Sequence, residues 1–154
     1  IVTLITEKAM WMARQDYLMT TFVPYANIVS AAMTVGEFAL KLRFDDLIYQ
    51  TKQIEPNDAQ KAYLDAFIAL MQDKEDTRVN ICAISIPADI NLAAGVEVTD
   101  KKQIHALKDI GQQREEAFKD YMVTNGNIAS ARLLLCAPKI DSSKDAKPRI
   151  ELSV

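Results

Sequence analysis

The sequence predicts an α+β domain in which helices cover one face of a mixed four-stranded sheet, preceded by two N-terminal helices. Two helical segments, 57–73 and 101–124, alternate with three segments of strand character. A further strand-like segment follows a short polar turn near the end of the chain. The 154 residues, 49% of them apolar and 25% charged, suffice for one domain with a real core.

The N-terminal quarter is expected to hold the two additional helices. Apolar residues fall near one side of a helix over 6–22, and Pro24 begins a second helical segment that ends near residues 36–40. The uncharged stretch 17–36 has the length of a membrane span. Because it contains Pro24 and several polar side chains, two short helices that meet at this proline are the better interpretation.

The first β-α-β unit begins with "LRFDDLIY", a strand over 42–49. Pro56 and Asn57 then suit the start of the helix over 57–73. The strand over 77–86 is apolar or small almost throughout its second half, which is typical of a strand covered on both faces. Pro87 ends this strand, and a loop follows as far as residue 100.

The second unit runs through the helix over 101–124, which Asp100 can cap. The sequence "NGN" ends this helix, with Gly126 suited to the left-handed position after it. An apolar strand over 131–139 is closed by Pro138. The last strand, 148–154, is expected at an edge or in antiparallel pairing.

The resulting order is β-α-β-α-β-β, and each β-α-β step implies parallel strands joined by a right-handed crossover. We assign residues 1–41 to a helical extension and residues 42–154 to the main domain.

Arg114 is the candidate binding residue, because it lies in the middle of an apolar helix stripe. At about 100° per residue, this stripe comprises Leu107, Ile110, Phe118 and Tyr121. Glu115 and Glu116 point away from it and are expected in solvent. Arg114 either receives an anion at the mouth of the sheet or is a structural arginine that pairs with a loop carboxylate, for which Asp89 is the candidate.

Cys82 and Cys136 each occupy a predicted apolar strand, and these strands are parallel neighbours. They form either a disulfide or two buried free thiols. The single histidine, His105, falls on a polar helix face, and no phosphate loop, metal-ligand spacing or nucleophile motif is present. We therefore expect no enzyme, metal or cofactor. The net charge of −3, with no basic run, argues against a nucleic-acid partner.

Three stretches resemble OmpA-like domains: "LIYQTKQIEPNDAQKAYLDAFIALMQDKEDTRVNI", "QQREEAFKDYMVTNGNIASARLLL" and "PRIELSV". The family grips a diaminopimelate carboxylate of peptidoglycan with an Asp from a "Gly-His-Thr-Asp" type motif and with the second Arg of "Leu-Ser-x-Arg-Arg". Arg114 stands at that Arg position, with Gln113 and Gly111 replacing the preceding Arg and the Ser. The Asp motif is replaced by "AISIPAD", in which Asp89 is the nearest candidate.

The stretches "WMARQDYLMTTFVPY", "RVNICAISIPAD" and "LLLCAPKID" are also similar to the C-terminal region of large AsmA-like envelope proteins of Gram-negative bacteria. The resemblance implies a non-catalytic periplasmic interaction or structural domain with a degenerate OmpA-like ligand pocket. Its partner would be an envelope component, either peptidoglycan or another protein, with membrane contact only through the parent protein. Peptidoglycan binding through Arg114 and a part in inter-membrane lipid transport are the alternatives.

The chain begins at Ile1 and shows no secretory signal, so we expect a fragment or a processed product whose compartment does not follow from its own N-terminus.

Overall fold

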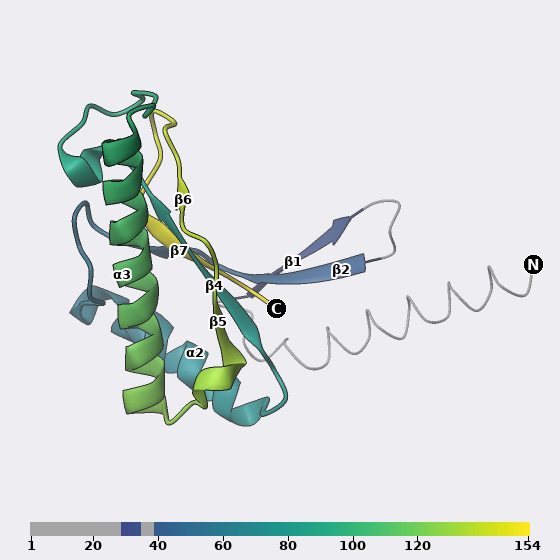
Figure 1. The fold of residues 1–154 in the computed structure, drawn as a ribbon. Coiled ribbons are helices and arrows are strands. Elements are labelled where there is room, and N and C mark those ends of the chain that lie inside the picture. The colour runs from purple at the N-terminus through teal and green to yellow at the C-terminus, as the bar shows by residue number, and fades with distance from the viewer. Residues whose placement is uncertain (1–28, 35–38) are drawn as a thin grey trace, which may run out of the picture.

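A computed structural model describes residues 29–34 and 39–154, with side chains described from Phe44 onward. Helices α2 (Lys61–Asp73) and α3 (Lys101–Gly126) lie on one face of a mixed sheet (Figure 1). Short 3-10 turns occupy Asp58–Gln60, Pro87–Ile90 and Ser130–Arg132. The strands are β1 (Val29–Thr34), β2 (Ala39–Phe44), β3 (Leu47–Ile48), β4 (Val79–Ser85), β5 (Leu133–Leu135), β6 (Lys139–Ile140) and β7 (Arg149–Ser153). The predicted α+β class is confirmed.

The sheet has the order β1-β2-β7-β4-β5, and two of its positions are interrupted strands. Strands β5 and β6 pair in parallel with successive parts of β4, and β2 and β3 pair antiparallel with successive parts of β7. If each interrupted pair is counted as one strand, this is the predicted four-stranded mixed sheet, extended by β1. Strand β7 lies between β3 and β4 and is antiparallel to both, so it is not an edge strand.

The N-terminal extension differs from the prediction where the structure describes it. The helix expected from Pro24 to residues 36–40 is wrong in this part, because Val29–Thr34 pairs antiparallel with Ala39–Phe44 as a hairpin. Backbone pairing at a sheet edge overrides a weak local preference for helix. The helix expected over 6–22 lies outside the described residues. Within the described ranges, neither long helix has the length and apolar character needed to cross a membrane.

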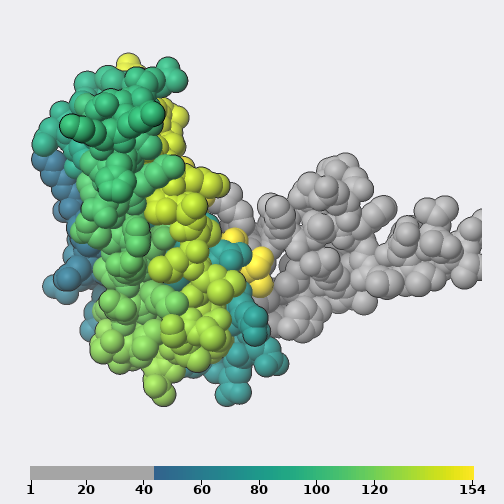
Figure 2. All heavy atoms as spheres, in the orientation of Figure 1, coloured from purple at the N-terminus to yellow at the C-terminus, as the bar shows by residue number. Residues whose placement is uncertain are grey.

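The core lies between the helices and the sheet. Phe67 of α2 packs edge-on against Phe44, with ring centroids 5.3 Å apart, and its centroid lies 5.7 Å from that of Phe118 on α3. Alternate residues of β4 and β7 point toward these rings and are fully buried: Val79, Ile81, Ala83, Ile150 and Leu152. In the space-filling view, α3 and the chain that follows it form much of the visible surface (Figure 2). The opposite sides of β4 and β7 carry mainly half-buried, more polar residues, with Ile84 as a buried apolar exception.

The end of α3 corrects one detail of the prediction. Gly126 is the last helical residue, and the left-handed position is taken by Asn127, with φ 51°. A Cβ atom on Gly126 would lie 2.9 Å from Cγ1 of Ile68 on α2. This glycine therefore permits close approach of the two helices, and the asparagine provides the turn.

The predicted strand over 131–139 is shorter than expected. Its regular part is split into β5 and β6, and Leu134 and Leu135 are 46% and 40% exposed. Pro138 lies in the break, where it cannot donate a backbone hydrogen bond to a neighbouring strand.

Candidate functional site

Arg114 projects from α3 toward the sheet and meets the carboxylate of Asp89 in the turn after β4. Its Nη1 donates to Oδ2 of Asp89 over 2.9 Å, and its Nη2 donates to Oδ1 over 2.8 Å. Both side chains are 0% exposed. The pair is thus a buried, two-pronged ion pair, the geometry in which a guanidinium and a carboxylate match best. The structure brings together the two residues that the sequence singled out, 25 positions apart.

The segment before α2 supplies most of the remaining partners of this pair. The Lys52 amide donates to Oδ1 of Asp89 over 2.7 Å, and Nε of Arg114 donates to the Gln53 carbonyl over 2.6 Å. The Ile86 amide donates to the other carboxylate oxygen over 3.0 Å. The guanidinium also lies over the ring of Tyr49, 5.6 Å from its centroid. Three segments of the chain therefore meet at this ion pair: residues 49–53, the turn after β4, and α3.

These contacts set the electrostatics of the site. Burial alone would raise the pKa of Asp89, but the hydrogen bonds from Arg114, Lys52 and Ile86 outweigh it and hold that pKa below its usual range. Burial raises the pKa of the neighbouring Tyr49 hydroxyl, although the positive charge of Arg114 works in the opposite direction. At neutral pH the site is thus a carboxylate–guanidinium pair with a neutral tyrosine beside it.

Residues 50–55 close over the pair, and their conformation is fixed from several directions. Lys52 has a left-handed backbone, with φ 68°, and its Nζ bonds to Oδ1 of Asn91. The Gln53 side chain donates to the Glu55 carbonyl and to Oε1 of Gln60, each over 2.8 Å. This segment therefore stands between the Arg114 guanidinium and solvent.

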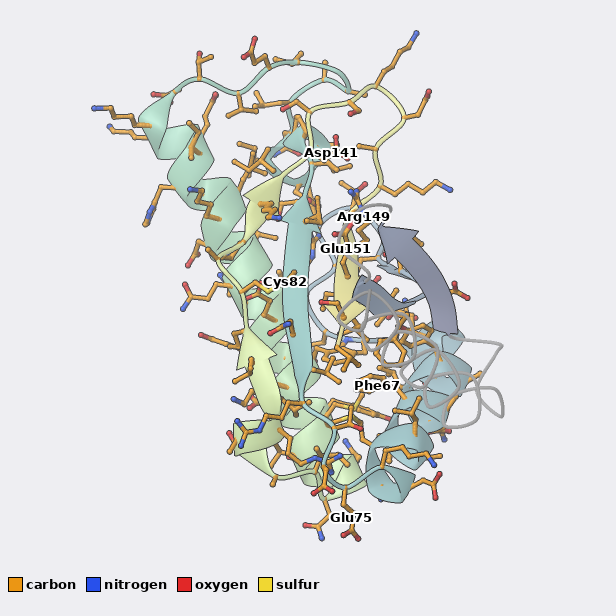
Figure 3. The ribbon with its side chains drawn as sticks, turned by 90° about the vertical axis from the view of Figure 1, so that its right-hand side faces the viewer. Phe67, Glu75, Cys82, Asp141, Arg149 and Glu151 are labelled. Atoms are coloured by element: carbon orange, nitrogen blue, oxygen red, sulfur yellow. A yellow bond between two sulfur atoms is a disulfide. The ribbon has the colours of Figure 1, made fainter. Side chains whose placement is uncertain are left out.

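Cys82 and Cys136 are joined in a disulfide, with their Cα atoms 4.9 Å apart. Cys82 lies midway along β4 (Figure 3), pairs with Glu151 of β7 in register, and is only half-buried. Because neighbours along a strand alternate between faces, and Ala83 faces α3, Cys82 points to the other face of the sheet. The disulfide is therefore separated from the Arg114–Asp89 pair by the sheet.

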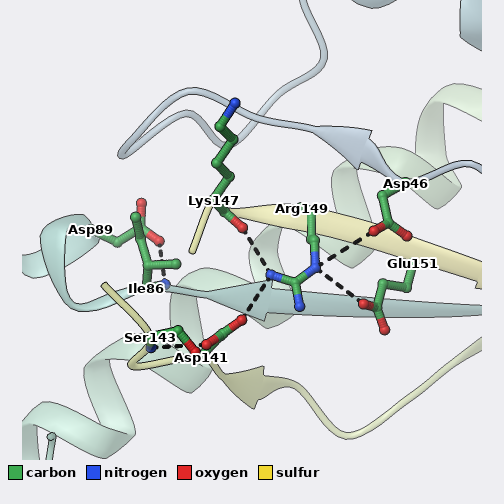
Figure 4. A network of polar contacts seen from close by, with 8 residues as sticks. All are labelled: Asp46, Ile86, Asp89, Asp141, Ser143, Lys147, Arg149 and Glu151. Carbon is green, nitrogen blue, oxygen red and sulfur yellow. Dashed lines mark hydrogen bonds and ion pairs between the residues drawn. The ribbon is translucent and has the colours of Figure 1, made fainter. Parts of the chain in front are cut away.

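A second polar cluster, which sequence reasoning did not single out as a site, surrounds Arg149 on β7 (Figure 4). The guanidinium contacts three carboxylates: Glu151 over 3.1 Å, Asp141 over 3.2 Å and Asp46 over 3.8 Å. Hydrogen bonds from Ser143, and then from Arg149, hold the pKa of Asp141 below its usual range. The OmpA-like strand motif "PRIELSV" contains two of these residues and was the available signal.

Glu115 corrects the prediction that it faces solvent. It is 1% exposed, and its Oε1 accepts a hydrogen bond from the Ala83 amide of β4 over 2.9 Å. Burial raises the pKa of this carboxyl to about 7, with the Ala83 hydrogen bond opposing the shift. Ala83 lies between the parts of β4 that pair with β5 and β6, so Glu115 satisfies an amide left by the strand break. Pro138 was the signal in the sequence that such a break exists.

His105 is exposed on α3, as predicted. In the part of the chain that the structure describes, no group of three or more His, Cys, Asp or Glu side chains is arranged to hold a metal ion.

No protein-family model matches the chain, and no curated protein matches it in sequence. Solved structures do resemble it. A MotB-like protein from Desulfovibrio vulgaris has a TM-score of 0.61 at 15% identity, covering 96% of this chain and 97% of that one. The OmpA-like domain of FopA1 from Francisella tularensis has a TM-score of 0.55 at 16% identity, covering 82% and 80%. The cell wall anchor of the T6SS from Pseudomonas aeruginosa has a TM-score of 0.50 at 12% identity, covering 89% and 95%.

These likenesses extend over most of each matched chain. At such low identities they establish the fold. The chain therefore has the fold of OmpA-like domains.

Proposed function

We propose that this chain is a non-catalytic periplasmic domain of a cell-envelope protein, with a docking or structural role, in which the OmpA-like ligand pocket is closed from within. The single observation that carries this proposal is the Arg114–Asp89 pair, in which both side chains are 0% exposed and bonded to each other. A free pocket would present its guanidinium to a ligand carboxylate. Here Asp89 takes that place, and the Gln53 carbonyl accepts from Nε.

Peptidoglycan binding through Arg114 is the second candidate. It is favoured by the fold shared with a cell wall anchor and by the position of Arg114 in the OmpA-like helix motif. For this function, an external carboxylate would have to displace Asp89 from the guanidinium, and residues 50–55 would have to move. The proposed AsmA-like parent protein and its part in lipid transport remain predictions from the sequence resemblance.

Co-sedimentation with purified peptidoglycan sacculi separates the two candidates. If the pocket is closed, the chain stays in the supernatant with sacculi to the same extent as without them. The cell wall anchor of the T6SS from Pseudomonas aeruginosa serves as the positive control for sedimentation.

The variant Arg114→Lys keeps the positive charge but loses the two-pronged geometry. Arg132→Met is the matched control, because Arg132 bonds only to the backbone carbonyls of Met71, Lys74 and Thr77. Suppose that the wild type and Arg132→Met sediment with sacculi and that Arg114→Lys does not. This result would establish peptidoglycan binding through Arg114 and overturn the closed pocket. Circular dichroism of each variant shows whether it has folded.

A further inference from the structure

A groove of about 470 Å³ runs along the outer side of α3, apart from the Arg114–Asp89 pair. One wall is the segment from Ile54 to Pro56, and the other is a stripe of α3. The stripe comprises Gln113, Glu116, Ala117, Asp120, Tyr121 and Thr124, whose spacing of three and four residues places them on one helix face. The volume lies within the range of about 300–1,000 Å³ that is common for binding pockets.

The lining of the groove combines apolar side chains with negative charge and contains no positive charge. Its half-buried residues are mainly apolar: Ile54, Pro56, Ala117 and Tyr121. Its exposed residues include three carboxylates, from Glu55, Glu116 and Asp120, and none of its lining residues is Lys or Arg. Arg114 adds no compensating charge, because it is already paired with Asp89.

The groove wall from Ile54 to Pro56 is held in place by hydrogen bonds of the adjacent Gln53 before any partner binds. The Gln53 carbonyl accepts from Nε of Arg114, and the Gln53 side chain donates to the Glu55 carbonyl. A wall fixed in this way loses little conformational entropy on binding, which favours even a small contact. The buried ion pair thereby has a second consequence, which is to position one side of the groove.

We propose that this groove docks a short basic and apolar segment of a partner protein. Lysine or arginine side chains of the partner pair with Glu55, Glu116 and Asp120, while an adjacent aromatic or aliphatic side chain packs on Tyr121 and Ala117. Charge complementarity identifies the occupant, since a groove with three carboxylates and no cation repels acidic segments. This docking needs no ligand at Arg114 and so goes beyond the function proposed above.

The test uses the full chain, labelled with ¹⁵N, and the amidated peptide Lys-Trp-Lys-Leu. We expect a Kd on the order of 0.1–1 mM at low salt, weakened by added salt. Amide shifts should concentrate at Ala117, Tyr121 and Thr124. The peptide Glu-Trp-Glu-Leu should cause no such shifts, and neither should spermidine, which has positive charge without an apolar side chain.

Two triple variants with the same change in net charge complete the design. Removal of the groove carboxylates in Glu55→Gln/Glu116→Gln/Asp120→Asn should weaken binding by about threefold to a hundredfold, since each exposed ion pair contributes a factor of about 1.4 to 5. The control variant removes exposed carboxylates elsewhere, as Asp76→Asn/Glu97→Gln/Asp145→Asn, and should change the Kd by less than about twofold.

The proposal is overturned if the lysine peptide causes no shifts up to several millimolar, if its shifts fall outside the groove, or if both triple variants weaken binding equally. Equal binding of the glutamate peptide or of spermidine would also overturn it. The amide spectrum of each variant shows independently that the fold is intact.

Discussion

Removal of one partner from the Arg114–Asp89 pair is the sharpest test of the structural role assigned to it. In Asp89→Asn the carboxamide replaces one acceptor oxygen with a donor, although the position receives four hydrogen bonds. At least one buried donor then faces another donor. The guanidinium remains buried and charged without its counter-charge.

The expected loss of stability follows from these contacts. An uncompensated buried charge in a broken pair costs about 3–5 kcal/mol, and we expect Asp89→Asn to fall in this range. Arg114→Met should cost somewhat less, about 2–4 kcal/mol, because Asp89 keeps the amide donors of Lys52 and Ile86. The double variant should lose far less than the sum of the single losses, giving a coupling energy of at least about 2 kcal/mol.

Urea unfolding at pH 7 measures the free energy of unfolding of each variant. Arg132→Met again provides the control, since its acceptor carbonyls are not partners of Asp89. Its effect should add to that of Asp89→Asn within about 0.5 kcal/mol. Losses below about 1 kcal/mol in both single variants, or strict additivity in the double variant, would refute the reasoning.

The pH dependence provides a second measure of the same pair. Because the pKa of Asp89 is lower in the folded chain than in the unfolded chain, the pair contributes its stability above the unfolded value of about 4. This contribution is lost as the pH falls through the lowered folded pKa. Asp89→Asn should lack this part of the acid destabilisation.

Two further predictions concern β4. The pKa of Glu115 is raised from 4.5 to about 7, so the free energy of unfolding should fall by about 1–3 kcal/mol as the pH rises through this interval. Urea unfolding between pH 5 and pH 8 measures this dependence, and Glu115→Gln should remove it. An unchanged pH dependence in the variant would contradict the assignment. The Cys82–Cys136 disulfide closes a loop with a sequence separation of 54, and its reduction should lower the free energy of unfolding by about 4 kcal/mol. Thiol titration of the unreduced, unfolded chain should find no free thiol, and two thiols would exclude the disulfide in that sample.

Periodicity predicted the two helices of the main domain well, because most of the buried apolar side chains of each helix recur with the helical period. The segment 57–73 contains α2, and Phe67, Leu64 and Leu70 in it are at most 1% exposed. The same reasoning failed for Val29–Thr34, where the pairing partner, and not the side-chain period, determines the conformation. A hairpin at a sheet edge leaves a weaker pattern in the sequence than a packed amphipathic helix does.

Glu115 shows the limit of reasoning from a helical projection. Seen along the helix axis it lies beside the predicted stripe, but the buried face of α3 extends over it and also contains Gly111, Met122 and Gly126. A stripe drawn through apolar residues alone missed this part of the face. Its hydrogen-bond partner is the Ala83 amide of another strand, which the periodicity of the helix does not record. Polar residues in the core are set by such partners, and so they are harder to predict from sequence than apolar ones.

The identity of the Arg114 partner illustrates the same principle at the candidate site. The sequence placed a permanent charge in an apolar stripe, which required an acceptor but did not distinguish a ligand carboxylate from Asp89. The distinction depends on Lys52 and Gln53, whose backbone groups complete the pair and carry no side-chain signal. With both charges satisfied internally, an external carboxylate must replace existing hydrogen bonds, whereas the acidic groove beside α3 needs no such exchange. Binding by this chain should therefore begin at the groove, with the buried pair holding one of its walls.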